Sequence, residues 1–220
     1  MKRQALARLC TFIFRFVNPF ALIADAIRVS LATMRWVILY VDTVLKEWDL
    51  YRAKLGRDIT ISELHLGGGT PTFLSPSELD RLASGILEKA KQAKHFEFSV
   101  EADPRVTNRE HLATLAKLGF KRLSLGIQDF DPKVQDIVHR VQTEEEVLKI
   151  VEMGRELGFN SINYDLIYGL PFQTRQSIER TIDVVRKTST GSHRFLRLCA
   201  RALDQTKPTP IYGSGFARRG

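Results

Sequence analysis

The sequence predicts an α/β fold, a partial (β/α) barrel in which parallel strands are joined by crossover helices. Between residues 40 and 186, short runs rich in β-branched residues alternate with amphipathic segments, which is the pattern of consecutive βα units. The predicted strands begin 27 to 39 residues apart, which is too far for hairpins and suits crossover helices. In such a barrel, functional groups gather at the carboxyl ends of the strands.

The predicted elements follow one another in a regular order. A first helix covers residues 40 to 55, and the strand pattern occurs at residues 62–66, 95–101, 122–127 and 161–167. The apolar face of that helix, expected to cover the sheet, consists of Val41, Val44, Leu45, Trp48 and Tyr51. The capping-box pattern, a hydroxyl residue followed three positions later by Glu, occurs at Ser75 with Glu78, at Thr107 with Glu110 and at Thr143 with Glu146. Gly119 and Gly158 are expected to end the helices that begin near Thr107 and Thr143.

The distribution of charged residues divides the chain at the same places as the alternation of predicted strands and helices. The 220 residues are 44% apolar and 26% charged, with a formal net charge of +8. Residues 1–40 carry six Lys or Arg and one Asp, and residues 187–220 carry seven and one, so the residues between them have a net charge of −3. The absence of basic charge from the middle argues against nucleic acid as a partner. We predict a core domain at residues 40–186, with irregular segments at 1–39 and 187–220.

Cysteine usage and hydropathy bear on the location of the protein. The two cysteines, Cys10 and Cys199, lie far apart, which indicates neither a disulfide framework nor a zinc site. The apolar stretch at residues 9–27 is interrupted by Arg15, Asn18 and Asp25, so we expect no membrane segment. A reducing, cytoplasmic location is therefore expected.

Polar and glycine residues stand where the predicted strands end. They are Gly68, Gly69 and Thr70 after the first strand, Glu101, Gln128 and Asp165 at the next three, and Arg140 after a short helix. Taken singly, the glycines suit a tight turn, and a strand-end carboxylate suits a helix cap or an ion pair. Together on one rim they suit a zwitterionic ligand with hydroxyls, because carboxylates bind ammonium and ribose groups and Arg binds a carboxylate.

Four motifs at these strand ends carry a family resemblance. GGGTPTFLSPSEL, FSVEADPR, RLSLGIQDFDPKVQ and INYDLIYGLPFQT resemble, in order and spacing, the oxygen-independent coproporphyrinogen III oxidases, which are radical S-adenosylmethionine (SAM) enzymes. The resemblance covers about two thirds of the chain. It implies a radical SAM barrel in which SAM contacts the residues of this rim: Gly68, Gly69, Thr70, Glu101, Gln128, Arg140 and Asp165.

The resemblance also implies a reaction and partners. The family decarboxylates two propionate groups of coproporphyrinogen III to give protoporphyrinogen IX in haem biosynthesis, using SAM, a 4Fe–4S cluster and an external electron donor. We expect a monomer that acts on this tetrapyrrole and binds neither nucleic acid nor a membrane. A related haem chaperone shares the barrel with the GGGTP and LIYGLP motifs and stays open as an alternative, although QDFDPKVQ is closer to the oxidase.

One part of the family pattern is absent. The family holds its cluster by a Cys-x3-Cys-x2-Cys run before the first helix, and such clusters need thiolates, whereas the amino-terminal half of this chain has Cys10 alone. The sequence therefore predicts a chain that holds no cluster and does not catalyse the reaction. It also predicts a barrel incomplete at its first and sixth strands.

Both flanks can be interpreted as out-of-frame translation. With suitable synonymous codons, residues 14–27 read one base out of frame give Ile-Pro-Phe-Cys-Glu-Ser-Leu-Cys-Ser-Tyr-Cys-Gly-Cys-Asn. Residues 198–207 likewise give Tyr-Ala-His-Ala-Pro-Trp-Ile-Lys-Pro. Both peptides resemble the family segments expected at those places. A nonfunctional, frameshifted fragment is thus a further interpretation, in which the basic charge of the flanks has no role.

Overall fold

Six parallel strands lie side by side in the order of the sequence, β1-β2-β3-β4-β5-β6. The structure is a computed structural model and describes residues 10–15, 31–56, 58–188 and 194–200. The strands are β1 (Cys10–Arg15), β2 (Thr60–Gly67), β3 (Lys91–Ala102), β4 (Arg122–Gln128), β5 (Ser161–Tyr168) and β6 (Arg194–Ala200). Sequential order with parallel pairing is the arrangement of a (β/α) barrel that is not closed.

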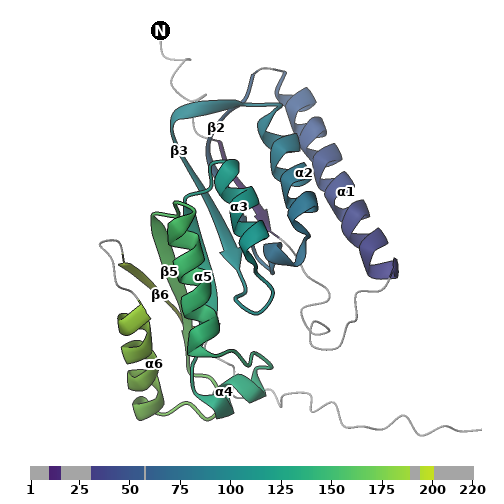
Figure 1. Cartoon of the computed structure of the whole chain (residues 1–220). Helices are drawn as coiled ribbons and strands as arrows, with labels where there is room; N and C mark the ends of the chain where they lie inside the picture. Colours follow the sequence, from purple (N-terminus) through teal and green to yellow (C-terminus); the bar gives the residue numbers. More distant parts are fainter. Residues whose placement is uncertain (1–9, 16–30, 57, 189–193, 201–220) are drawn as a thin grey trace, which may run out of the picture.

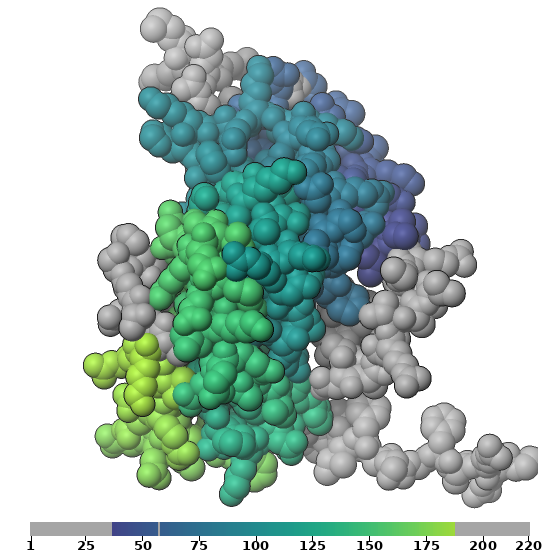
Figure 2. All heavy atoms as spheres, in the orientation of Figure 1, coloured from purple at the N-terminus to yellow at the C-terminus, as the bar shows by residue number. Residues whose placement is uncertain are grey.

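Helices lie along one face of this sheet (Figure 1). The helices of the described chain are α1 (Leu31–Leu55), the short 3-10 helix η1 (Pro71–Phe73), α2 (Pro76–Leu87), α3 (Arg109–Lys117), α4 (Pro132–Ile137), α5 (Glu144–Glu156) and α6 (Arg175–Thr188), and α4 lies at the ends of the strands. Helix α1 contacts α2, α2 contacts α3, α3 contacts α5, and α5 contacts α6. This row of helices forms the surface seen in Figure 2. Among the described residues, no helix is long and apolar enough to cross a bilayer.

The four predicted strands are confirmed as β2 to β5. The edges differ from the prediction, since the structure places β1 beside β2 and β6 beside β5, where an irregular flank and missing strands were expected. Ladder hydrogen bonds join backbone groups, so a segment without the family's side chains can still occupy an edge. The first helix also begins earlier, at Leu31. The division into a core and two flanking segments stays a prediction.

The two faces of the sheet differ in polarity because side chains alternate along each strand. The side chains that face the helices are fully buried and apolar: Leu64, Leu66, Phe98, Val100, Leu123 and Leu125. The alternate positions carry small or polar residues: His65, Gly67, Ser99, Glu101, Ser124, Gly126, Asn163 and Asp165. The polar face leads to the carboxyl ends of the strands, so the core under the helices holds that face in place.

The first helix buries most of its predicted face. Val41, Val44 and Trp48 are buried against the sheet side, but Tyr51 is 55% exposed, so its predicted burial is wrong. At 100° per residue, Tyr51 points about 80° away from Val41, which is enough to leave the buried stripe.

The predicted helix starts are confirmed in part. At α5, Thr143 Oγ1 accepts from the Glu146 backbone and the Glu146 carboxylate accepts from the Thr143 backbone, which completes the predicted capping box. At α2, Ser75 Oγ accepts from the Glu78 backbone at 3.3 Å. The described residues therefore show one complete predicted box and one half of another.

The predicted cap at Thr107 is wrong by one residue. Asn108 caps α3 instead, and its side chain accepts from the backbone of His111 at 3.0 Å. Thr107 Oγ1 donates to the backbone oxygen of Asp103 at 2.7 Å, which removes it from the cap. His111 Nε2 lies 3.0 Å from the backbone oxygen of Leu74, and burial lowers the pKa of this imidazole below its ordinary value. The neutral ring with a proton on Nε2 fits that contact.

Candidate functional site

A cavity of about 250 Å³ lies at the carboxyl ends of β2 to β5. Six of the seven residues predicted from the sequence line it: Gly69, Thr70, Glu101, Gln128, Arg140 and Asp165. The seventh, Gly68, adjoins it, because its backbone N–H donates to Glu101 Oε2 at 2.7 Å. The structure thus brings all the predicted residues to one rim. Their contact with SAM stays a prediction.

Two glycines make room for the polar groups of this cavity. A Cβ on Gly67 would lie 2.3 Å from His65 Nε2 and 2.8 Å from Glu101 Cδ. A Cβ on Gly126 would lie 2.9 Å from Arg140 Nη1 and 3.1 Å from Gln128 Nε2. Real Cβ atoms do not approach other heavy atoms as closely as 2.3 Å, so the side chains occupy space that only glycine leaves open.

An ion pair with the buried Asp103 holds Arg140 at the cavity. Its Nη2 lies 3.4 Å from Asp103 Oδ2, and Asp103 also accepts from the guanidinium of Arg105 at 2.9 Å. Burial by itself raises the pKa of Asp103, but the hydrogen bonds from Arg105 and the charge of Arg140 outweigh it and hold the pKa below its ordinary value. Asp103 is therefore ionised at neutral pH and keeps Arg140 at the cavity.

Two side chains that were not singled out from the sequence support Glu101. His65 Nδ1 lies 2.8 Å from Ser99 Oγ, and His65 Nε2 lies 3.4 Å from Glu101 Oε1. A chain of contacts thus runs from the polar face of the sheet to Gly68. The alternation of β2 could have indicated His65, because it occupies a position two residues before Gly67.

Asp165 is held from the neighbouring strand. Ser124 Oγ donates to Asp165 Oδ2 at 2.8 Å, and Gly126 is the register partner of Asp165 on β4. A carboxylate oriented by a hydroxyl donor can accept hydrogen bonds from ligand hydroxyls. This arrangement fits the contact with ribose hydroxyls that is expected of a carboxylate on this rim.

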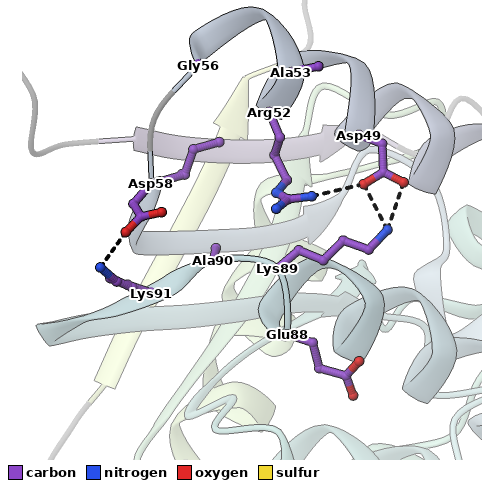
Figure 3. Close-up of a pocket in the computed structure, with 10 residues that line it drawn as sticks. Asp49, Arg52, Ala53, Gly56, Asp58, Glu88, Lys89, Ala90 and Lys91 are labelled. Carbon is purple, nitrogen blue, oxygen red and sulfur yellow. Dashed lines mark hydrogen bonds and ion pairs between the residues drawn. The ribbon is translucent and has the colours of Figure 1, made fainter.

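A second and larger hollow, of about 760 Å³, lies at the other end of the sheet. Figure 3 shows three ion pairs among the charged side chains that line it: Lys89 with Asp49, Arg52 with Asp49, and Lys91 with Asp58. The hydrogen bond from Lys89 lowers the pKa of Asp49. In (β/α) barrels the amino-terminal end of the strands serves stability, so the smaller cavity is the candidate functional site.

Comparison with known proteins shows the family to which the chain belongs. Residues 35–185 match the Radical SAM superfamily. The chain belongs to this superfamily. The radical SAM chain is 43% identical over 151 residues to an oxygen-independent coproporphyrinogen III oxidase of Helicobacter pylori, which is 68% of this chain and 33% of that protein. It is 44% identical over 148 residues to the oxidase of Pseudomonas aeruginosa, covering 66% and 32%.

Solved structures agree with the sequence matches. The radical SAM coproporphyrinogen III oxidase of Escherichia coli superposes with a TM-score of 0.68 at 38% identity, over 74% of this chain and 37% of that one. An archaeal Elp3 of Methanocaldococcus infernus gives a TM-score of 0.52 at 15% identity, which shows a shared fold alone. The resemblance seen in the motifs is confirmed. The chain spans about a third of the length of the oxidases it matches.

The radical SAM superfamily uses SAM and a 4Fe–4S cluster, and the residues present fit these two groups unequally. The cavity has the acids, the amide and the arginine that a zwitterionic nucleoside needs, in a space slightly below the roughly 300 Å³ at which small-molecule sites begin. In the described part of the chain, no three His, Cys, Asp or Glu side chains gather to hold a metal. The whole sequence has two cysteines, so it does not fit a cluster that needs three thiolates.

Proposed function

We propose that this chain is part of an oxygen-independent coproporphyrinogen III oxidase and that the cavity at the ends of β2 to β5 binds SAM. The observation that carries the proposal is the convergence of Gly69, Thr70, Glu101, Gln128, Arg140 and Asp165 on one cavity. Sequence identity above 40% to curated oxidases over this region supports the substrate class, a tetrapyrrole with propionate side chains.

The side chains have distinct tasks in SAM binding. Arg140 takes the carboxylate of the methionine part, because a guanidinium has five donors, and the contacts with Asp103 and with the backbone oxygen of Gly126 leave others for the ligand. Glu101, held by the N–H of Gly68, takes the ammonium. Asp165 accepts from the ribose hydroxyls. The glycine backbone of residues 67–69 allows the ligand to lie close to the strand end.

In the complete enzyme, each propionate group loses a hydrogen atom, carbon dioxide and one electron, and becomes a vinyl group. Bound SAM supplies the group that accepts the hydrogen atom, and an electron acceptor takes the electron. This chain lacks the thiolates that SAM cleavage requires, so we propose that it binds SAM without catalysing the decarboxylation. We further propose that it is monomeric and cytoplasmic and that the complete enzyme uses a separate electron donor. The wide spacing of the two cysteines supports the reducing location.

Isothermal titration of the purified chain with SAM tests the proposed site. We expect saturable binding that weakens at least tenfold in Glu101→Gln, because the ammonium loses a charged partner. Glu97→Gln is the matched control, since Glu97 lies on the same strand and is exposed, paired with Arg122. No binding by the original chain, or equal loss in both variants, would contradict the proposal. Binding of haem instead of SAM would favour the chaperone.

A further inference from the structure

Gln128, at the end of β4, has a backbone conformation that side chains rarely adopt. Its φ is +67°, and the N–H of Asp129 donates to the backbone oxygen of Ile127 at 2.8 Å. A hydrogen bond between residues two apart, around a residue with positive φ, defines the rarer and strained form of the γ-turn. Strained residues that the surrounding structure holds in place concentrate at ligand sites. A turn of this kind persists only where neighbouring groups hold it in place.

Two buried glutamines hold the carbonyl groups on both sides of Gln128. Gln142 Nε2 donates to the oxygen of Ile127 at 2.8 Å, and Gln135 Nε2 donates to the oxygen of Asp129 at 3.0 Å. The two residues also bind each other, because Gln135 Nε2 donates to the backbone oxygen of Gln142 and the backbone N–H of Gln142 donates to Gln135 Oε1. Gln135 is 4% exposed and Gln142 is 5% exposed, so water does not compete for these bonds.

The side chain of Asp129 fixes the other end of the turn. It is 1% exposed and accepts from Thr181 Oγ1 at 2.7 Å and from the N–H of Asp131 at 2.8 Å. Gln173 Nε2 donates to the same carboxylate and to the backbone oxygen of Ile167. The turn is thereby joined to α6 and to the end of β5, which lines the cavity. A fully satisfied buried network of this kind makes a segment rigid.

The turn directs the Gln128 amide into the cavity. Gln128 Nε2 and Arg140 Nη1 lie over Gly126, each about 3 Å from the place where its Cβ would be. We propose that Gln135 and Gln142 are positioning residues that hold the strained turn, so that Gln128 is presented to the ligand before the ligand binds. This inference rests on the proposed SAM site. Holding the geometry in advance lowers the cost of ordering on binding, so the two glutamines set affinity without touching SAM.

Gln142→Met in the full chain tests the inference, because methionine keeps the length of the side chain and loses the amide. Gln176→Met is the matched control, since Gln176 is exposed on α6. Amide hydrogen exchange by NMR is measured at Asp129, whose N–H closes the turn, and at Leu125 in the same strand. SAM affinity is measured by titration, with Gln128→Ala as the reference for complete loss of that side chain.

We expect Gln142→Met to speed exchange at Asp129 at least tenfold with less than twofold change at Leu125, and to weaken SAM binding about tenfold. Gln176→Met should change neither the exchange nor the affinity.

Unchanged exchange at Asp129 would overturn the inference. Faster exchange with unchanged SAM affinity, while Gln128→Ala weakens binding, would also overturn it, because the turn would then be structural alone. Failure of the original chain to bind SAM refutes the proposed function itself. The exchange measurement distinguishes that result from failure of the inference, because it tests the turn separately from SAM binding. Faster exchange at both amides would show a general loss of stability and would likewise count against a local clamp.

Discussion

Replacing Gly126 with Ala is expected to separate ligand binding from stability. A Cβ at this position would lie 2.9 Å from Arg140 Nη1 and 3.1 Å from Gln128 Nε2, so both groups must move. Both are the far ends of flexible side chains, and the nearest backbone atom, the oxygen of Ala102, is at 4.0 Å. Gly126 has no positive φ, so alanine fits its backbone. The substitution therefore displaces the cavity groups while the fold remains intact.

The expected magnitudes follow from these contacts. Alanine reduces the freedom of the unfolded chain, which stabilises a compatible site by about 0.4–1 kcal/mol, and the displaced side chains offset part of that gain. We expect the free energy of unfolding to change by less than about 1 kcal/mol. A hydrogen bond to a charged group contributes about 1.5–3 kcal/mol, so loss of the Arg140 contact alone should weaken SAM binding tenfold or more.

Urea unfolding and titration with SAM measure the two effects on the same protein. Gly154→Ala is the matched control, because a Cβ there meets Ile162 and Leu123 at 3.5 Å, an ordinary contact, and lies within α5. That control should gain up to about 1 kcal/mol of stability and keep the original affinity. If Gly126→Ala binds SAM as tightly as the original chain, the assignment of Gln128 and Arg140 to the ligand is refuted.

Three further predictions concern the cluster, the gene and pH. Anaerobic reconstitution with iron and sulfide should give no visible 4Fe–4S absorbance, because two distant cysteines cannot hold a cluster; one cluster per chain would contradict this. Resequencing the gene around codons 10–40 and 185–210 should reveal shifted frames at both flanks, and a confirmed frame encoding them as they stand would defeat that hypothesis. The pKa of Asp103 is lowered in the folded chain, so its carboxylate stabilises the fold fully at pH values above the unfolded pKa of about 3.9. This stabilisation is lost as the pH falls through the pKa of the folded state. Urea unfolding at pH 5 and pH 3 should therefore show a larger loss for the original chain than for Asp103→Asn, and equal losses would exclude this role of the carboxyl.

The strands and the rim could be predicted because their signals are local. Alternating burial places Glu101 and Asp165 on the polar face of their strands, and parallel strands bring their carboxyl ends to one edge. The cap of α3 was missed because Thr107 and Asn108 are adjacent and both can cap a helix. Only the hydrogen bond from Thr107 to Asp103, a contact of the folded chain, decides between them.

The support of Gln128 could not be predicted from the sequence. Gln135 lies within the short helix α4, and Gln142 lies in a polar run that is typical of a solvated loop. Glutamine is exposed in most folded proteins, so neither position indicates burial. Their amides become useful only when the turn at Gln128 places two carbonyl groups within reach, and no pattern of spacing describes that turn. Polar networks of this kind depend on tertiary geometry.

The family's chemistry requires SAM binding and thiolates that hold a 4Fe–4S cluster, and these two requirements depend on different parts of the chain. Every residue of the proposed SAM site falls between Gly67 and Asp165, within the region that matches the superfamily. The thiolates that the cluster needs belong before that region, where this sequence has one cysteine. Cavity shape, the Asp103 ion pairs and the Gln135–Gln142 contacts are all made within residues 58–188, so none of them depends on the cluster. We therefore propose that binding of the nucleoside and the redox step are separable, and we expect this chain to keep the first while lacking the second.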